Sequence, residues 1–140
     1  AGPEDFDELL SALFRLHAAR WNALGQPGVL AAVEPFHREA ARAFLDCGML
    51  RLYGLRMPAG LAGVLYGFAG HGSFYAYLDG FDPAFAHLSP GTVLVGHAVA
   101  CAIAEGLAEF DFLRESETFK YGWGAVDRPN LRLVVRQVPA

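Results

Sequence analysis

Residues 86–94, AHLSPGTVL, lead directly into 95–106, VGHAVACAIAEG, which is apolar on nearly every side. Ser89 fits the N-cap position of a helix and Pro90 fits the first helical position. A helix that is apolar on nearly all sides is covered on nearly all sides. We therefore predict a buried helix over residues 90–106 that lies flat on a sheet.

The segments before this helix have the pattern of strands. Residues 49–57 (MLRLYGLRM), 61–69 (LAGVLYGFA) and 73–81 (SFYAYLDGF) are separated by short turns at 58–60 and 70–72. Short turns permit only antiparallel pairing, so these runs predict an antiparallel meander. The apolar helix then has to cross from the third strand to a parallel neighbour.

The fold class that follows is α+β, a mixed sheet with helices on both faces, formed by one domain over residues 1–140. An N-terminal helix lies within residues 1–24 and is a candidate peripheral element. The second helix is expected to face inward with Phe36, Ala40, Phe44 and Leu45. The N-terminal helix is expected over residues 5–21 and the second helix over 31–47. The other expected elements are a strand over 110–114, a helical turn near Thr118 and a last strand over 131–138.

The composition excludes several classes of function. There are 11 basic and 15 acidic residues, a net charge of −4, which argues against a nucleic-acid platform. The apolar run 92–104 is shorter than the roughly 20 residues of a membrane span. Cys47 and Cys101 fall in apolar helical patterns, which predicts buried thiols and a cytoplasmic location. The histidines and cysteines have no metal-ligand spacing, so we expect no metal site.

The start of the apolar helix is a candidate anion site. The first turn of a helix leaves backbone amides without intrahelical partners and carries the positive end of the helix dipole. Gly91 would let a phosphate approach the backbone. The alternative is that Ser-Pro-Gly only caps a buried helix, and the local sequence does not decide between the two.

Four quoted stretches resemble one family. FHREAARAFLDCGMLRLYGLRM, GVLYGF, FYAYLDGFDPAFAHLSPGTVL and DFLRESETFKYGWG resemble the GNAT-fold acyltransferases, in the bacterial branch of cellulose-biosynthesis-type and FemAB-like proteins. The resemblance covers about residues 21–136. It implies transfer of an acyl group, acetyl being the expected one, from coenzyme A (acetyl-CoA) to an amine or hydroxyl of a small molecule or peptide.

The resemblance also implies a binding site for the donor. The pantetheine arm would pair with the splayed edge of the third strand, from Tyr75 through Tyr77 to Asp79, whose amides would polarise the thioester. The bend at Gly80 would suit this splay. The pyrophosphate would sit on the amides of the loop and helix start, namely Ser89, Gly91, Thr92 and Val93.

The chain departs from the family pattern at two places. The loop before the helix usually begins with Gln or Arg, and here that place is Leu88, while Val93 fills the last place. Many members carry a tyrosine that protonates the leaving thiolate, and here that position is Phe119, followed by Lys120. The acid is therefore either Tyr121 or absent.

Three residues are candidate general bases for the amine: Asp79, His37 and Glu117. Each has a structural alternative. Asp79 precedes a glycine and fits a turn, His37 fits a helix surface, and Glu117 fits a surface ion pair with Lys120. His97 is expected to be a hydrogen-bonded core residue.

Two other functions remain open at this point. One is a FemAB-like aminoacyl transferase that uses charged tRNA, and the other is a non-catalytic lobe for binding or assembly. FemAB-like relatives commonly pair two lobes in one chain. A homodimer or a missing second lobe is therefore a further expectation.

Overall fold

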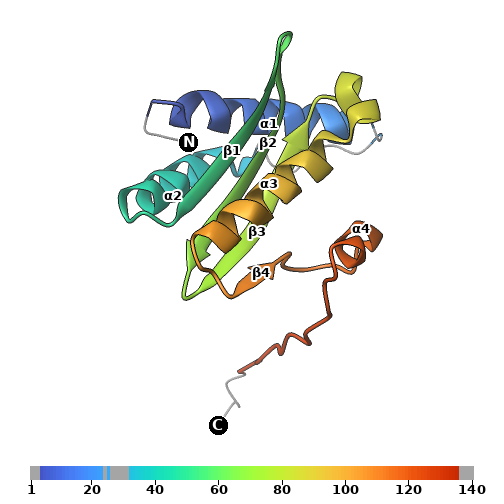
Figure 1. Ribbon diagram of the computed structural model, residues 1–140. Helices are drawn as coiled ribbons and strands as arrows, with labels where there is room; N and C mark the ends of the chain where they lie inside the picture. Colours follow the sequence, from blue (N-terminus) through green and yellow to red (C-terminus); the bar gives the residue numbers. More distant parts are fainter. Residues whose placement is uncertain (1–3, 24, 26–31, 136–140) are drawn as a thin grey trace.

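The computed structural model describes residues 4–23, 25 and 32–135. The sheet has the order β1-β2-β3-β4, with antiparallel β1, β2 and β3 and with β4 parallel to β3 (Figure 1). This confirms the α+β fold with a meander and a crossover. The elements are α1 (Phe6–Ala23), α2 (Glu34–Asp46), β1 (Leu50–Met57), β2 (Gly60–Gly70), β3 (Ser73–Phe81), the 3-10 helix η2 (Pro83–Leu88), α3 (Pro90–Ala104), β4 (Glu109–Asp111) and α4 (Thr118–Gly122).

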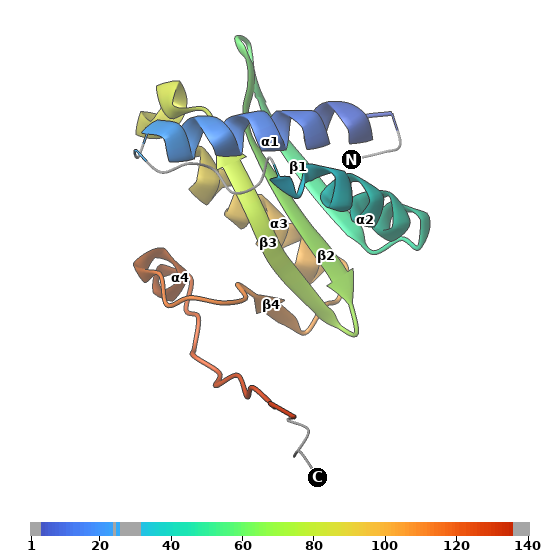
Figure 2. The same cartoon turned by 180° about the vertical axis from the view of Figure 1, so that it is seen from behind.

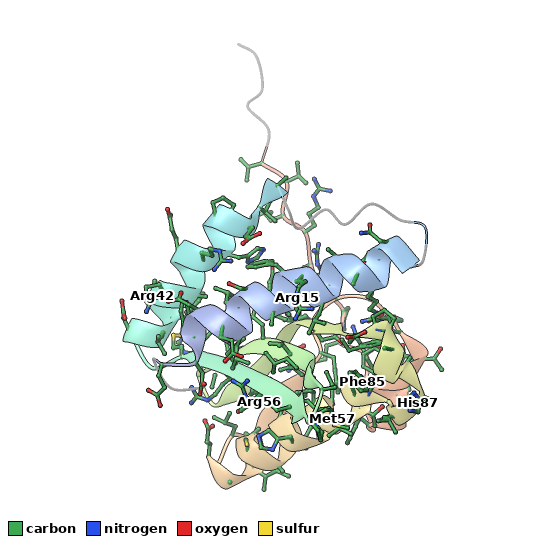
Figure 3. The ribbon with its side chains drawn as sticks, turned by 90° about the horizontal axis from the view of Figure 1, so that it is seen from above. Arg15, Arg42, Arg56, Met57, Phe85 and His87 are labelled. Carbon is green, nitrogen blue, oxygen red and sulfur yellow. The ribbon has the colours of Figure 1, made fainter. Side chains whose placement is uncertain are left out.

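Helices cover both faces of the sheet. Helix α3 packs on one face (Figure 1), and α1 and α2 pack on the other (Figure 2). Helix α1 is no peripheral element, because its apolar side chains dominate the core on that face, where they pack against Leu52, Val64 and Tyr66. Arg15 on α1 and Arg42 on α2 are both exposed (Figure 3), and Arg42 reaches across to the Phe6 ring and Asp7 of α1.

The inner face of α2 differs from the expectation. His37 and Ala41 are buried, whereas Phe36 is 66% exposed. The buried stripe follows the i, i+4 spacing from His37 to Ala41 and continues with Phe44 and Leu45 packed against the core. Phe36 is one position away from that stripe, about 100° around the helix, and therefore faces solvent.

Helix α3 is covered on one side only. Its buried residues are Pro90, Leu94, Val95, Ala98 and Ala102, but Ile103 on the opposite side is 71% exposed. The expectation of cover on nearly all sides is therefore wrong for the described chain, since the sheet lies on a single face of the helix. For the same reason His97 is an exposed residue rather than a core residue.

The two cysteines are not buried as predicted. Cys47 is exposed and Cys101 is partly buried. Helix α2 ends at Asp46, so Cys47 lies just beyond it and not on its inner face. The Cys101 thiol lies 3.5 Å from His97 Nε2.

The last predicted strand is not present in the part of the chain that is described. Residues 131–135 have no regular structure, and Leu131 is 97% exposed. Residues 136–138 lie outside the described residues. Apolar alternation alone does not form a strand without a neighbouring strand to pair with. The strand predicted over 110–114 is shortened to Glu109–Asp111, and among the described residues no helix is long and apolar enough to cross a membrane.

Candidate functional site

Strand β3 has a neighbour on both sides only in its first three residues. It pairs with β4 through Ser73 and Glu109, Phe74 and Phe110, and Tyr75 and Asp111. The chain leaves the sheet after Asp111, and at Leu113 its φ is +59°. From Ala76 to Phe81, β3 is therefore paired with β2 alone, which is the splay expected at this edge.

A β-bulge lies at the point where the splay begins. Tyr66 pairs with Leu78 and Gly67 pairs with Ala76, so Tyr77 is the extra residue of β3. Gly67 makes this geometry possible, because a Cβ there would lie 2.6 Å from the carbonyl oxygen of Tyr75. The bulge leaves the Tyr77 backbone outside the regular ladder, where its groups are available to a ligand.

A cavity of about 830 Å³ opens beside this unpaired edge. Its walls are the open half of β3, the start of α3, the loop after β4, and α4, which stands apart from the sheet in Figure 1. The structure brings six of the predicted site residues to this cavity: Tyr77, Asp79, Ser89, Gly91, Thr92 and Glu117. The other four, Tyr75, Val93, His37 and Tyr121, are not among its lining residues.

Asp79 is the acidic group at the open edge of β3. Arg20 of α1 donates through Nη1 to both carboxylate oxygens at 3.3 Å. Burial raises the pKa of Asp79, the Arg20 charge opposes this shift, and the Glu117 carboxylate adds to it. The Asp79 side chain is still 41% exposed. A carboxyl group with a raised pKa and access to a cavity can accept a proton from a bound substrate.

The start of α3 offers fewer free amides than the sequence suggested. The Ser89 amide donates to the carbonyl oxygen of Ala86, and the amides of Thr92 and Val93 both donate to the carbonyl oxygen of Ser89. Of the four predicted amides, only that of Gly91 has no acceptor among the described residues. Ser89 occupies the N-cap position, but its φ is +51° and its side chain makes no capping bond.

The family is shown by comparison with known proteins. Residues 1–121 match the family model described as an acetyltransferase (GNAT) domain. This chain belongs to the GNAT acetyltransferase domain family. No curated protein and no solved structure matched it.

The cavity wall of this GNAT domain is organised by a buried lysine that sequence reasoning missed. Lys120 is 7% exposed, and its Nζ donates to the carbonyl oxygens of Phe112, Arg114 and Glu115 at 3.1, 2.7 and 3.0 Å. It also lies 3.1 Å from the Glu117 carboxylate. The predicted surface ion pair is therefore part of a buried anchor for the loop. Only the folded loop brings these carbonyl groups together, so no sequence signal could have found it.

His37 lies on the opposite face of the sheet from α3. It is buried, and burial lowers its pKa. Its ring lies 5.6 Å from the ring of Tyr77, which reaches the cavity, and 6.3 Å from that of Tyr66. The alternative that His37 lies on the helix surface is therefore wrong. His37 does not line the cavity itself but contacts Tyr77, which does.

Tyr121 lies outside the cavity, whereas Phe119 lines it. The Tyr121 hydroxyl donates to both carboxylate oxygens of Asp127, at 3.0 and 3.1 Å. The role of Tyr121 as an acid stays a prediction.

His17 on α1 is a second residue that the sequence did not reveal. Trp21 Nε1 donates to His17 Nε2 at 2.7 Å, so Nε2 must be unprotonated and the proton is assigned to Nδ1. Burial, with the charge of Arg20, lowers the pKa of His17 to about 4. Its backbone nitrogen would lie 2.7 Å from a Cβ at Gly80, so Gly80 serves the close packing of α1 rather than the splay.

Proposed function

We propose that this GNAT domain transfers an acyl group from acyl-coenzyme A, acetyl-CoA being the expected donor, to an amine or hydroxyl of a small molecule or peptide. The observation that carries the proposal is the cavity along the unpaired edge of β3, which extends to the start of α3. An extended arm that hydrogen-bonds to a strand edge gains affinity from the backbone groups of that edge. The membership in the acetyltransferase family supports the same activity.

The residues present fit such a donor. The open half of β3 offers amides and carbonyls to the two amide groups of a pantetheine arm, and Gly91 offers one free amide near the positive end of α3. Coenzyme A, when bound, supplies the acyl group as a thioester, whose carbon an amine can attack. We also propose the cellulose-biosynthesis-type and FemAB-like branch, on the motifs quoted above.

Of the three acidic residues that line the cavity, Asp79 and Glu117 are the candidates to receive the proton of the amine. Asp79 and Glu117 both line the cavity, whereas the third candidate, His37, does not. Asp79 is the stronger candidate because its pKa is raised by burial, which makes its carboxylate a better base. Backbone amides at the Tyr77 bulge would polarise the acyl carbonyl.

Proton donation to the leaving group is a smaller requirement. A thiolate whose conjugate acid has a pKa near about 8.5 leaves without obligatory protonation. Phe119 at the cavity is therefore compatible with transfer.

Calorimetric titration with coenzyme A tests the proposal. Gly91→Val should fold, because a Cβ there would make only ordinary contacts, 3.6 Å from Asp79 Oδ2. The added methyl groups would crowd the cavity beside the Gly91 amide, and we expect affinity to fall about tenfold or more. Val93→Ile is the control, since Val93 is exposed on the same helix and does not line the cavity.

Two results would contradict the proposal. One is the absence of coenzyme A binding by the wild-type protein. That result would favour one of the two alternatives, a tRNA-dependent aminoacyl transferase or a non-catalytic lobe. The other is unchanged affinity in a folded Gly91→Val protein, which would place the donor elsewhere. A homodimer or a second lobe stays a prediction that light scattering on the active protein tests.

A further inference from the structure

The start of α3 has too little positive charge for a pyrophosphate group. Gly91 contributes one free amide, and the Asp79 carboxylate would lie 3.6 Å from a Cβ at Gly91. Leu88, which stands where the family pattern has Gln or Arg, is an exposed apolar residue. A dianionic group at this place would meet a carboxylate and no cation from the loop, so a charge from another element is required.

Three cationic residues line the cavity: Arg20, Arg114 and Lys120. Lys120 is bonded to loop carbonyl groups, and Arg20 is the one that contacts Asp79, beside Gly91. Arg20 comes from α1, lines the same cavity and is bonded to Asp79 through Nη1 alone. Among the described residues, Nε and Nη2 of Arg20 have no hydrogen-bond partner. The guanidinium also lies over the ring of Phe81 at 4.8 Å, which holds its plane at the open edge of β3.

The ion pair between Arg20 and Asp79 is weak enough for another anion to replace Asp79 as the partner of Arg20. Both N–O distances are 3.3 Å, longer than the 2.7–2.9 Å of strong charge-assisted bonds. The Arg20 side chain is 33% exposed, and exposed pairs of this type contribute about 0–1 kcal/mol. A phosphate group can accept two parallel bonds from the guanidinium fork, which this carboxylate does not do here.

We propose that Arg20 binds the pyrophosphate of the donor. When the donor enters, Arg20 releases the Asp79 carboxylate and bonds to the pyrophosphate instead. Arg20 thereby replaces, from α1, the basic residue that is missing at Leu88. This inference rests on the proposed function, since it takes coenzyme A as the ligand.

Calorimetry with two probes tests the inference. Coenzyme A carries the pyrophosphate, whereas pantetheine has the same arm without any phosphate. Arg20→Gln should weaken coenzyme A binding at least tenfold and change pantetheine binding less than twofold. Arg56→Gln is the matched control, because Arg56 also pairs with carboxylates, those of Glu8 and Asp5, but does not line this cavity.

Asp79→Asn gives an independent measurement. Removal of the competing carboxylate should leave coenzyme A affinity unchanged or stronger, and Arg20→Gln should lower the salt dependence of binding. If Arg20→Gln does not fold, Arg20→Lys keeps the charge without the fork, and a fall in coenzyme A affinity with unchanged pantetheine affinity still supports the inference.

The outcomes separate this inference from the proposed function. Wild-type protein that binds coenzyme A, together with an Arg20→Gln protein whose affinity is within twofold, overturns the role of Arg20 and leaves the function standing. Equal losses for coenzyme A and pantetheine also overturn it, because they indicate a structural role. Wild-type protein that binds neither probe overturns the proposed function itself.

Discussion

The two halves of β3 differ although they belong to one strand. In the first half, Phe74 is fully buried and stacks on Phe110 of β4 with ring centroids 4.7 Å apart. In the second half, Tyr77 is 43% exposed and Asp79 lines the cavity. The parallel partner ends after three residue pairs. Where β4 is present the strand builds the core, and where β4 is absent it presents backbone and side chains to a ligand.

The open half still needs support on the faces of the sheet. Helix α1 provides it, because the chain of α1 at Leu13 and His17 approaches Gly80 closely enough to exclude a Cβ. Arg20 on the same helix bonds to Asp79 at the edge. The open half is thus held by β2 and α1, whereas the paired half is held by two strands and by α3.

The largest effect is expected for truncation in the paired half. Phe74→Ala should lower the free energy of unfolding by about 3–5 kcal/mol, because the side chain is fully buried between α3 and the sheet. Tyr77→Ala in the open half is the comparison variant and should cost about 1 kcal/mol or less, since that ring is 43% exposed. Urea denaturation measures both values. Equal losses would show that the two halves do not differ in their contribution to stability.

Lowering the pH should reduce the free energy of unfolding, because protonation of His17 disturbs the helix that supports the open half of β3. Its pKa is about 4 in the folded protein and 6.5 ordinarily, so the unfolded chain binds more protons between these values. Stability should therefore rise with pH over this window and be lost as pH falls, by on the order of 3 kcal/mol in total. Protonation of Nε2 also removes the acceptor for Trp21. His17→Gln, followed by denaturation across pH 4–7, should flatten this dependence; a slope unchanged from wild type would assign it to other groups.

A single methyl group should disturb the contact between α1 and β3. Gly80→Ala should cost about 1–3 kcal/mol, because the new Cβ would lie 2.7 Å from the His17 nitrogen and 3.0 Å from the Leu13 carbonyl oxygen. Gly122→Ala is the control, with no atom within 4 Å of its Cβ. Thermal unfolding compares the two variants. A wild-type melting temperature for Gly80→Ala would mean that α1 can shift at no cost.

The smallest effect is expected across the cavity, at Tyr121. Its hydroxyl is bonded to Asp127 and it does not line the cavity, so Tyr121→Phe should retain acyl transfer within about twofold across the pH range. The measurement is steady-state turnover once an acceptor is known. A loss of roughly 100-fold with donor affinity intact would instead identify Tyr121 as the acid.

Much of the fold could be predicted because it depends on local pattern. The alternation of residues 50–57 and 73–81 and the short turns between them require antiparallel pairing. The start of α3 at Pro90 and the approximate strand ends followed from turn and cap chemistry. The predicted strand over 131–138 failed for a related reason. Its pattern is local, but a strand also needs a neighbour, and residues 131–135 have none.

The candidate site was predicted in part. Asp79, Gly91 and Glu117 were found because they lie near the end of a strand, at the start of a helix and in an irregular acidic segment, and the structure gathers them at one cavity. Arg20 was missed, since an arginine on an amphipathic helix has no sequence feature that distinguishes it from a solvated one. Phe36 was assigned to the inner face of α2, where His37 lies instead, because the burial of α2 depends on how it packs against the sheet.

The sequence by itself determined the order of the helices and strands as far as α4, because backbone periodicity, turns and caps act over a few residues. Tertiary structure alone decided the electrostatics of the site. Arg20 meets Asp79 across 59 residues of chain, and Lys120 meets three carbonyl groups that only the folded loop brings together. Charges and hydrogen bonds act through distance in space, and that distance is set only when α1, β3 and the loop after β4 are packed together.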